Sequence, residues 1–416
     1  MTETTFHLKE NYVPVTDELT TFDLPVSGAI PPELNGWHLR NGPNPRTPTQ
    51  HWFFGDGMLH GVRLENGRAA WYRNRWVRTE SFDAPRPPGP GGKPDLRNSA
   101  ANTHIVNHAG KTLALVETAL PYEVTTDLDT VGPYDFDGRL ATPMTAHPKI
   151  CPETGELHFF GYAREQPYLT YHRADAHGVL RLSRQVEVGG PTMMHDFALT
   201  SRHVVFLDLP LVFVPGGRGM PFSWDPDYPA RIGLLRRDDP QGTVRWFPIE
   251  PCYLFHTLNA HEAGDEVVLY GVRYAHLWWQ GHEGVPGTLW RWRLNTRTGA
   301  VREEQVDDRD CEFPRIDDRL AGLDVRYGHV TTDTSLIRYD LHTGSADVHE
   351  FGPGRTPGEA VFASPRWLIT YVYDRTRGAS DLVILDATNP AAAPAATVAL
   401  PARVPEGFHG NWIADA

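Results

Sequence analysis

The chain has 416 residues, and its 39 basic and 52 acidic side chains leave a formal net charge of −13. This balance argues against DNA or RNA as a partner, because nucleic-acid affinity depends on lysine and arginine releasing counterions. Hydrophobic residues make up 40% and charged residues 22%, as in ordinary folded proteins and unlike disordered ones. The 38 glycines, 36 prolines, 12 tryptophans, 15 tyrosines and 18 phenylalanines favour many short strands joined by turns.

The cysteines bear on the compartment. Cys151, Cys252 and Cys311 are far apart and odd in number, which fits neither a disulfide framework nor a cysteine-based zinc site. No run of residues approaches the 18 or more apolar residues of a membrane-spanning helix. We therefore expect a cytoplasmic protein.

Turn signals between alternating apolar and polar residues recur along the chain and predict β-hairpins. In chain order they are Glu65–Gly67, Ala176–Gly178, Gln241–Gly242, Thr298–Gly299, Thr343–Gly344 and Asn389–Pro390. More apolar runs lie between them and predict strands that are buried on both faces. These runs are Thr112–Val116, His203–Leu209, Glu266–Tyr270 and Trp367–Tyr373.

The spacing of the hairpins indicates a repeated unit. Counted from Gly67 to Pro390, successive turns are 111, 64, 57, 45 and 46 residues apart, and the chain holds seven units if the longest interval contains two. Four-stranded repeats of about 40 to 50 residues are typical of a β-propeller. We therefore expect an all-β propeller whose long connections are candidates to roof a pocket. A pair of β-sandwiches is the alternative.

Histidines are the main candidates for chemistry, because the compact motifs of common enzymes are absent: Gly-x-Ser-x-Gly, His-Glu-x-x-His and the dinucleotide-binding glycine pattern. Four of the 20 histidines adjoin small or apolar residues, and they are His147, His195, His256 and His409. They are 48, 61 and 153 residues apart, about one, one and three repeat lengths. The innermost strands of a propeller could bring them to one axis. Twenty histidines offer many such subsets, so surface or core histidines remain the alternative.

Eight short segments resemble the signature segments of the carotenoid cleavage oxygenase family. They are Asn41–Pro45, Phe54–His60, Ala101–Thr103, Thr145–Pro148, Met194–Phe197, Glu312–Arg315, Gly358–Phe362 and Phe408–Trp412. They follow the order of the family from about residue 35 to residue 412, so the match is specific. The resemblance implies a seven-bladed β-propeller with a dome of loops and short helices over its top face, forming one domain over residues 1–416.

The resemblance also implies iron(II), held by His147, His195, His256 and His409. It implies three outer carboxylates that orient His195, His256 and His409 in that order, and these are Glu117, Glu312 and Glu359. Imidazole suits iron, and a carboxylate on its second ring nitrogen fixes the tautomer. Four neutral ligands leave room on the metal for O2 beside an alkene, whose double bond would be split into two carbonyl products.

Other residues are candidates for the active site. By the same resemblance, Thr103 is expected to restrict one open metal position, with an ordinary strand threonine as the alternative. Phe54, Trp76 and Phe313 are candidates for an apolar tunnel, and core packing is an equal alternative for each. The apolar segments Leu211–Pro215 and Met220–Phe222 favour either peripheral contact with a membrane surface or a loop folded into the dome.

Val116 bears on the substrate. Relatives that cleave 4-hydroxystilbenes often carry a lysine immediately before the first outer glutamate, where this chain has Val116. Without that charge a phenol loses a charge-assisted contact, which favours a carotenoid or apocarotenoid over a stilbene or phenylpropene. We expect O2 and an apolar conjugated small molecule as partners, with no obligate protein partner. A polyene isomerase, or a propeller that only binds its ligand, is the alternative from another class.

Overall fold

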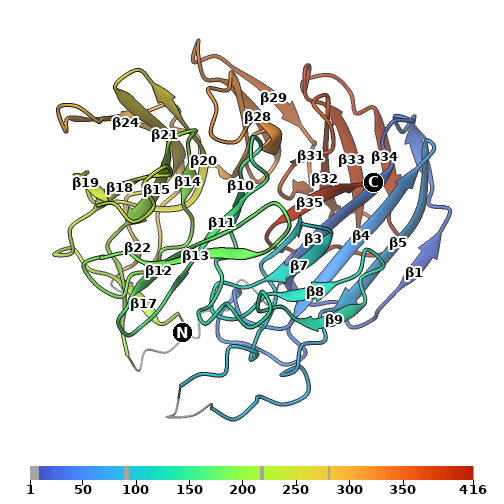
Figure 1. Ribbon diagram of the computed structural model, residues 1–416. Coiled ribbons are helices and arrows are strands. Elements are labelled where there is room, and N and C mark those ends of the chain that lie inside the picture. The colour runs from blue at the N-terminus through green and yellow to red at the C-terminus, as the bar shows by residue number, and fades with distance from the viewer. Residues whose placement is uncertain (1–8, 89–92, 216–219, 280–281, 416) are drawn as a thin grey trace. The chain divides into compact units, whose positions relative to one another are not determined.

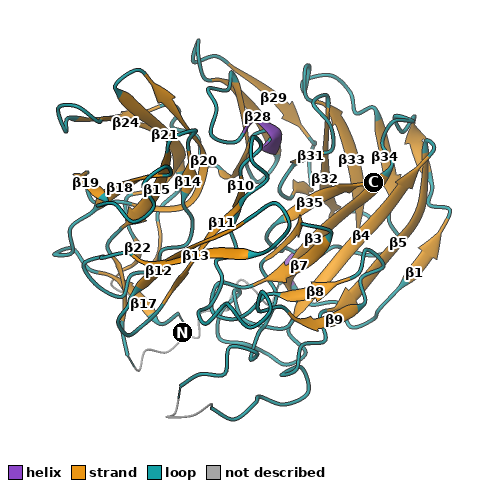
Figure 2. Ribbon diagram, in the orientation of Figure 1, coloured by secondary structure: helices purple, strands orange, loops and turns teal. Residues whose placement is uncertain are grey.

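The computed structural model describes residues 9–88, 93–215, 220–279 and 282–415. Strands form nearly all of its regular structure (Figure 2), and the described residues contain two short 3-10 helices, Glu10–Tyr12 and Asp318–Leu320. The abundant glycine, proline and aromatic residues therefore form strands and turns, as the composition predicts. None of the helices in these ranges is long and apolar enough to cross a membrane.

The chain divides into two compact units. Unit 1 comprises Met1–Ala141, Asp333–Ile337 and Asp347–Ala416, and unit 2 comprises Thr142–Thr332 and Arg338–Ala346. The single domain over residues 1–416 stays a prediction.

Unit 1 contains three sheets among its described residues, and the order of the first is β1-β5-β4-β3-β35. The second is β6-β7-β8-β9, and the third is β2-β34-β33-β32-β30, with β31 also paired to β32. The strands are β1 Thr20–Phe22, β2 Val26–Gly28, β3 Gly36–Pro43, β4 Gly57–Glu65, β5 Arg68–Trp76, β6 His104–His108, β7 Lys111–Leu115, β8 Tyr122–Val124, β9 Thr130–Pro133, β30 Arg355–Pro357, β31 Val361–Phe362, β32 Trp367–Asp374, β33 Ala379–Asp386, β34 Ala396–Ala399 and β35 Gly410–Ala414.

The first sheet of unit 1 joins residues from opposite ends of the sequence. Strand β35 pairs antiparallel with β3, from Gly36 opposite Ala414 to Arg40 opposite Gly410 (Figure 1). The edge of this sheet is therefore supplied by a segment about 370 residues later in the chain than its neighbour.

Unit 2 contains three four-stranded sheets, β10-β11-β12-β13, β14-β15-β18-β19 and β20-β21-β24-β25, and two small sheets, β16-β17 and β22-β23, within the described ranges. The strands are β10 Lys149–Ile150, β11 Leu157–Tyr162, β12 Leu169–Ala174, β13 Leu180–Gln185, β14 Ala198–Leu199, β15 His203–Asp208, β16 Leu211–Phe213, β17 Phe222–Trp224, β18 Arg231–Arg236, β19 Arg245–Pro248, β20 Tyr253–Ala263, β21 Glu266–Tyr274, β22 Leu277–Trp279, β23 His282–Gly284, β24 Thr288–Asn295 and β25 Val301–Gln305.

One further sheet has the order β26-β27-β28-β29. Its strands are β26 Glu312–Arg315, β27 Tyr327–Thr331, β28 Ser335–Asp340 and β29 Ala346–Glu350. The described residues thus form seven sheets of four or more strands, one for each expected blade. The fold is the predicted all-β, seven-bladed β-propeller.

All six turn signals connect neighbouring antiparallel strands, so the predicted hairpins are confirmed. Gly67 and Gly299 adopt φ of +73° and +83°, in the region that only glycine enters without steric cost. The apolar runs are strands β7, β15, β21 and β32, and most of their side chains are buried. The glycine-containing turns therefore determine where strands reverse, and burial of the apolar runs determines which strands lie inside the sheets.

Candidate metal centre

Three histidines of unit 2 lie together where three different sheets begin. His147 precedes β10, His195 precedes β14 and His256 lies near the start of β20, and β14 and β20 run beside each other (Figure 1). Nε2 of His147 lies 3.0 Å from Nε2 of His195. The three ring centroids are 4.5, 4.9 and 5.2 Å apart, and one nitrogen from each ring lies within 4.8 Å of the others. Unit 2 thus brings together three of the four predicted histidines.

A β-bulge determines where His256 points. Between Leu254 and Thr257 the register with β21 shifts, so that Phe255 and His256 oppose a single residue. Such a bulge bends the strand and re-aims its side chains. A Cβ on Gly271, in the facing strand, would lie 3.1 Å from the carbonyl oxygen of His256. A side chain at this position would therefore crowd the bulge, and glycine leaves it room.

Glu312 fixes the orientation of the His256 ring. Its Oε2 lies 2.6 Å from Nδ1 of His256, and its Oε1 accepts a hydrogen bond from the Tyr274 hydroxyl at 2.9 Å. Burial, together with the charge of Glu312, raises the pKa of Tyr274 well above its ordinary value, so the phenol keeps its proton and donates. With Nδ1 held by a carboxylate, Nε2 is the nitrogen that the ring offers to a ligand.

Two residues of this site were missed by sequence reasoning. Besides Tyr274, Thr145 links two of the histidine segments, because its hydroxyl donates to the carbonyl of His195 at 3.2 Å and accepts the N–H of His147 at 3.1 Å. Thr145 belongs to the signature segment Thr145–Pro148, but nothing in that segment distinguishes it. Tyr274 is one of many aromatic residues in the predicted strands. Neither position carries a signal of its own.

The donor set of unit 2 fits a divalent transition metal. Three buried imidazoles supply nitrogen ligands without adding negative charge, and imidazole suits iron as well as zinc, copper and nickel. Two imidazoles bound at right angles about 2.1 Å from one metal would have their nitrogens roughly 3 Å apart. The 3.0 Å between Nε2 of His147 and Nε2 of His195 matches that separation.

The fourth predicted histidine lies in unit 1 with a carboxylate of its own. His409 directly precedes β35, and its Nδ1 is 3.0 Å from Oε1 of the buried Glu359. The other oxygen, Oε2, accepts the N–H of Gly410 at 2.8 Å. As with His256 and Glu312, the carboxylate occupies Nδ1 and leaves Nε2 as the ligand atom.

Thr103 is tied to His409 through the backbone, since its carbonyl oxygen accepts the N–H of His409 at 3.1 Å. Its hydroxyl donates to Oδ1 of Asn102 at 2.9 Å, and the Asn102 amide donates to two backbone carbonyls of the loop that carries Phe54. Within unit 1, one chain of hydrogen bonds therefore places Thr103, Phe54 and His409.

Glu117, the outer carboxylate predicted for His195, lies beside Val116 in unit 1. Val116 is buried directly after β7, and Glu117 follows it, half-buried. Glu117 belongs to unit 1 and His195 to unit 2, and their pairing stays a prediction.

The two remaining tunnel candidates differ in their surroundings. The ring of Phe313 lies over that of His256, with centroids 5.8 Å apart and planes 25° from parallel. Phe313 has φ of +51°, a conformation that bulky residues rarely adopt. Trp76 instead donates its indole N–H to the carbonyl of Asn44 at 3.2 Å. Phe313 is thus the candidate that unit 2 places directly at the histidines.

The apolar segments form the small sheet of β16 and β17 in unit 2, where Phe213 pairs with Phe222 and their rings lie 6.0 Å apart. Leu211 and Phe222 are buried, whereas Val214 is 43% exposed. The described residues of these segments therefore range from buried to exposed, and both interpretations, contact with a membrane surface and a loop folded into the dome, stay predictions.

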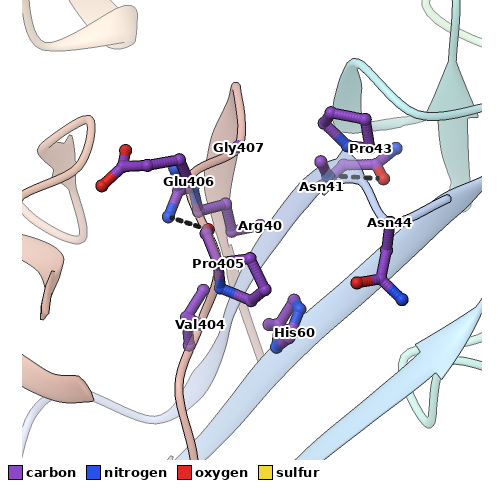
Figure 3. A pocket seen from close by; sticks show the side chains of 10 residues that line it. Arg40, Asn41, Pro43, Asn44, His60, Val404, Pro405, Glu406 and Gly407 are labelled. Atoms are coloured by element: carbon purple, nitrogen blue, oxygen red, sulfur yellow. Dashed lines mark hydrogen bonds between the residues drawn. The ribbon is translucent and has the colours of Figure 1, made fainter. Parts of the chain in front are cut away.

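A small cavity in unit 1 lies between β3 and the segment before β35 (Figure 3). Its lining includes Arg40, His60 and Glu406. The volume available inside it to the centre of a water molecule is about 10 Å³. That is near the minimum for one water molecule. Burial raises the pKa of Glu406, and the charge of Arg40 opposes that shift. The cavity is far too small for a conjugated hydrocarbon.

Known proteins resemble this chain over nearly its whole length. The family model described as retinal pigment epithelial membrane protein matches residues 12–414. The carotenoid cleavage oxygenase of Mycobacterium tuberculosis is 39% identical over 98% of this chain and 97% of its own. The carotenoid 9,10(9',10')-cleavage dioxygenase of Crocus sativus is 35% identical over 98% of this chain and 89% of its own.

Solved structures also resemble the chain over nearly its whole length. The lignostilbene dioxygenase of Pseudomonas brassicacearum has a TM-score of 0.90 and 28% identity, with 99% of each chain covered. The cobalt-substituted apocarotenoid oxygenase of Synechocystis has a TM-score of 0.85 and 26% identity, with 97% of each chain covered.

Proposed function

Because the chain belongs to the carotenoid cleavage oxygenase family, it is an alkene-cleaving oxygenase, and we propose that it uses iron(II). The proposed reaction cleaves one C=C double bond of a carotenoid or apocarotenoid with O2 and gives two carbonyl products. The observation that carries the proposal is the group of three buried histidines from three sheets, with ring nitrogens within 4.8 Å of one another.

His409 is the proposed fourth iron ligand, beside His147, His195 and His256. Its support is its burial and its pairing with Glu359 through Nδ1, which repeats the arrangement of His256 with Glu312. Glu117 is the proposed carboxylate behind His195. Thr103 is proposed to restrict the space beside the metal, since its backbone is bonded to His409.

Bound iron(II) would supply the position at which O2 reacts beside the substrate alkene. Glu312 would hold the proton on Nδ1 of His256 and so keep the lone pair of Nε2 directed at the metal. Tyr274 would keep that carboxylate in place through its second oxygen. Phe313 would cover one face of the His256 ring and exclude water from it. Together these residues would keep a set of neutral ligands rigid and dry around the reacting atoms.

The proposed substrate follows from Val116, which is buried and carries no charge for a phenolic oxygen. A stilbene is the second candidate, favoured by the TM-score of 0.90 with the lignostilbene dioxygenase of Pseudomonas brassicacearum. The proposed compartment is the cytoplasm, in keeping with three buried cysteines that form no disulfide.

The test is aerobic incubation of iron-loaded protein with two panels, one of carotenoids and apocarotenoids and one of 4-hydroxystilbenes. Oxygen uptake, bleaching and aldehyde products are measured. We expect uptake and aldehydes with the first panel and none with a His256→Ala variant. The matched control is His203→Ala, because His203 also pairs with a glutamate, Glu262, through Nδ1 at 2.9 Å but is not one of the clustered histidines.

Turnover of the stilbenes alone would replace the proposed substrate by the second candidate. No oxygen uptake with either panel would overturn the proposed reaction, and full iron content with full activity in His256→Ala would overturn the ligand set.

A further inference from the structure

We propose that the carboxylate of Asp196 is the positioning group that holds the three histidine-bearing segments of unit 2 in register, with Lys149 and Thr257 as its partners. This inference rests on the proposed function in one respect, namely that these histidines bind a metal. It assigns a role to the ion pair between the half-buried Lys149 and the buried Asp196, which the resemblance leaves without one.

The carboxylate of Asp196 is 1% exposed and receives four hydrogen bonds. Its Oδ1 lies 2.8 Å from Nζ of Lys149 and accepts the N–H of Phe197 at 2.7 Å. Its Oδ2 accepts both the N–H and the hydroxyl of Thr257, at 2.7 and 2.8 Å. Two oxygens with four donors are fully satisfied, so this side chain has one well-defined position.

The partners of Asp196 come from three sheets. Lys149 opens β10, Asp196 lies just before β14, and Thr257 is in β20. Each is one or two residues from one of His147, His195 and His256. One carboxylate therefore connects the three backbone segments that carry the proposed histidine ligands. These segments are separated by 47 and 61 residues in the sequence.

The bond to Thr257 also accounts for the bulge at His256. Thr257 lies where the register between β20 and β21 shifts, and its N–H donates to Asp196. The carboxylate thus serves as the acceptor for a backbone group at the irregular point of the strand. Loss of this acceptor should let the bulge relax and turn the His256 ring away from its neighbours.

The experiment uses metal-free full-length protein titrated with Co²⁺, whose visible absorption reports the geometry of its ligands. Asp196→Asn keeps the shape of the side chain but removes its charge and turns one acceptor into a donor. We expect it to bind Co²⁺ at least about 10-fold more weakly and with an altered visible spectrum, as is usual when the group behind a metal ligand is lost. Thr257→Val removes one hydroxyl donor, should fold more readily, and should show the same change to a smaller extent.

Asp208→Asn is the matched control. Asp208 is equally buried in unit 2, and its carboxylate is held by Arg231, Tyr228 and the N–H of Gly189. We expect this variant to lose stability and yet bind Co²⁺ with the affinity and spectrum of the unmodified protein.

Amide hydrogen exchange of the metal-free proteins separates this inference from the proposed function. Asp196→Asn should lose protection at the N–H groups of Phe197 and Thr257, and Asp208→Asn should not. If the unmodified protein binds no Co²⁺, the proposed metal centre fails, and the exchange measurement still decides the positioning role. Unchanged Co²⁺ affinity and spectrum in Asp196→Asn and Thr257→Val, or unchanged protection at Phe197 and Thr257, would overturn the inference.

Discussion

Glu312 and Glu359 each place a carboxylate oxygen on Nδ1 of a histidine, at 2.6 and 3.0 Å. A carboxylate in that position selects the tautomer with its proton on Nδ1 and increases the basicity of Nε2. The same two glutamates also accept backbone N–H groups, from Phe313 and Gly410. Glu312 is therefore anchored within its own strand β26, and Glu359 is anchored to β35, the strand that follows the ring it orients.

We predict that Glu312→Gln lowers the affinity for iron(II) by roughly 10- to 100-fold, because an amide holds the His256 ring less firmly and does not increase its basicity. Iron content after dialysis against a chelator series measures the change. Glu262→Gln is the control, since Glu262 pairs with His203, which is not one of the clustered histidines. Equal iron retention in both variants would contradict the role given to Glu312.

For single residues, the sequence is most informative where a recognisable segment contains them. His147, His195, His409, Glu312 and Glu359 lie in such segments, whereas His256 and Glu117 lie outside them. The structure places His256 with Glu312 and His409 with Glu359. The contact of Asp196 with Lys149 and Thr257 could not be predicted in the same way. It depends on the register of three separate sheets, and no local pattern encodes an acceptor 61 residues away.

The bulge in β20 is the element that most directly shapes the site. Its space depends on Gly271, where an added Cβ would lie 2.7 Å from Cδ2 of Leu254 and 3.1 Å from the carbonyl oxygen of His256. The leucine can rotate, but the carbonyl belongs to the bulge itself.

We therefore predict that Gly271→Ala lowers the free energy of unfolding by about 1–3 kcal/mol, as overpacking usually does, and also weakens metal binding. Denaturant unfolding and a metal titration measure the two effects. Gly233→Ala is the control, because its Cβ would lie 2.6 Å from the ring of Trp246 in another strand pair. The interpretation fails if Gly271→Ala loses stability while its metal affinity equals that of the control.

The turns were predictable because their conformation depends on local residue chemistry. All six turn signals connect paired strands, because glycine, asparagine and proline in tight turns act locally. The bulge in β20 and the small sheets β16-β17 and β22-β23 were not predicted. A register shift and a two-stranded sheet are decided by what packs against them, and their sequences resemble those of ordinary strands or loops.

Over the whole molecule, buried neutral histidines outside the proposed centre make stability depend on pH. Burial lowers the pKa of His60 and His329 to about 3 and that of His172 to about 4, and lowers that of His158 well below its ordinary value. In the unfolded chain these histidines take up a proton near pH 6.5. Below that pH the unfolded state binds more protons than the folded state, so acid favours unfolding.

As the pH falls from 6.5 toward its pKa in the folded protein, each of these four histidines should lower the free energy of unfolding by about 1.4 kcal/mol per pH unit. Above pH 7 none of them should make the free energy of unfolding depend on pH. Urea unfolding of metal-free protein between pH 7.5 and pH 5 measures the slope. His60→Gln should reduce the slope by about 1.4 kcal/mol per pH unit, the share of one histidine. An unchanged slope in that variant would show that His60 is not held neutral.

The spacing of the turns predicts seven blades only if the interval from Gly67 to Gly178 holds two units, and the sheet β6-β7-β8-β9 does lie in that interval. The pairing of β35 with β3 was not predictable, since nothing in either strand marks a partner about 370 residues away. Next to this pairing, the carbonyl of His409, which directly precedes β35, accepts the N–H of Asn41 in β3 at 3.0 Å.

Because β3 pairs with β35, this sheet cannot be completed until a segment about 370 residues later in the chain has been synthesised. The ribosome makes β3 early, yet this strand waits for its neighbour until residues 410–414 have left the exit tunnel. A message cut short at any codon before 409 yields a product that lacks both the closing strand and one proposed iron ligand. Truncated chains would present β3 as an open sheet edge for proteases and chaperones to recognise.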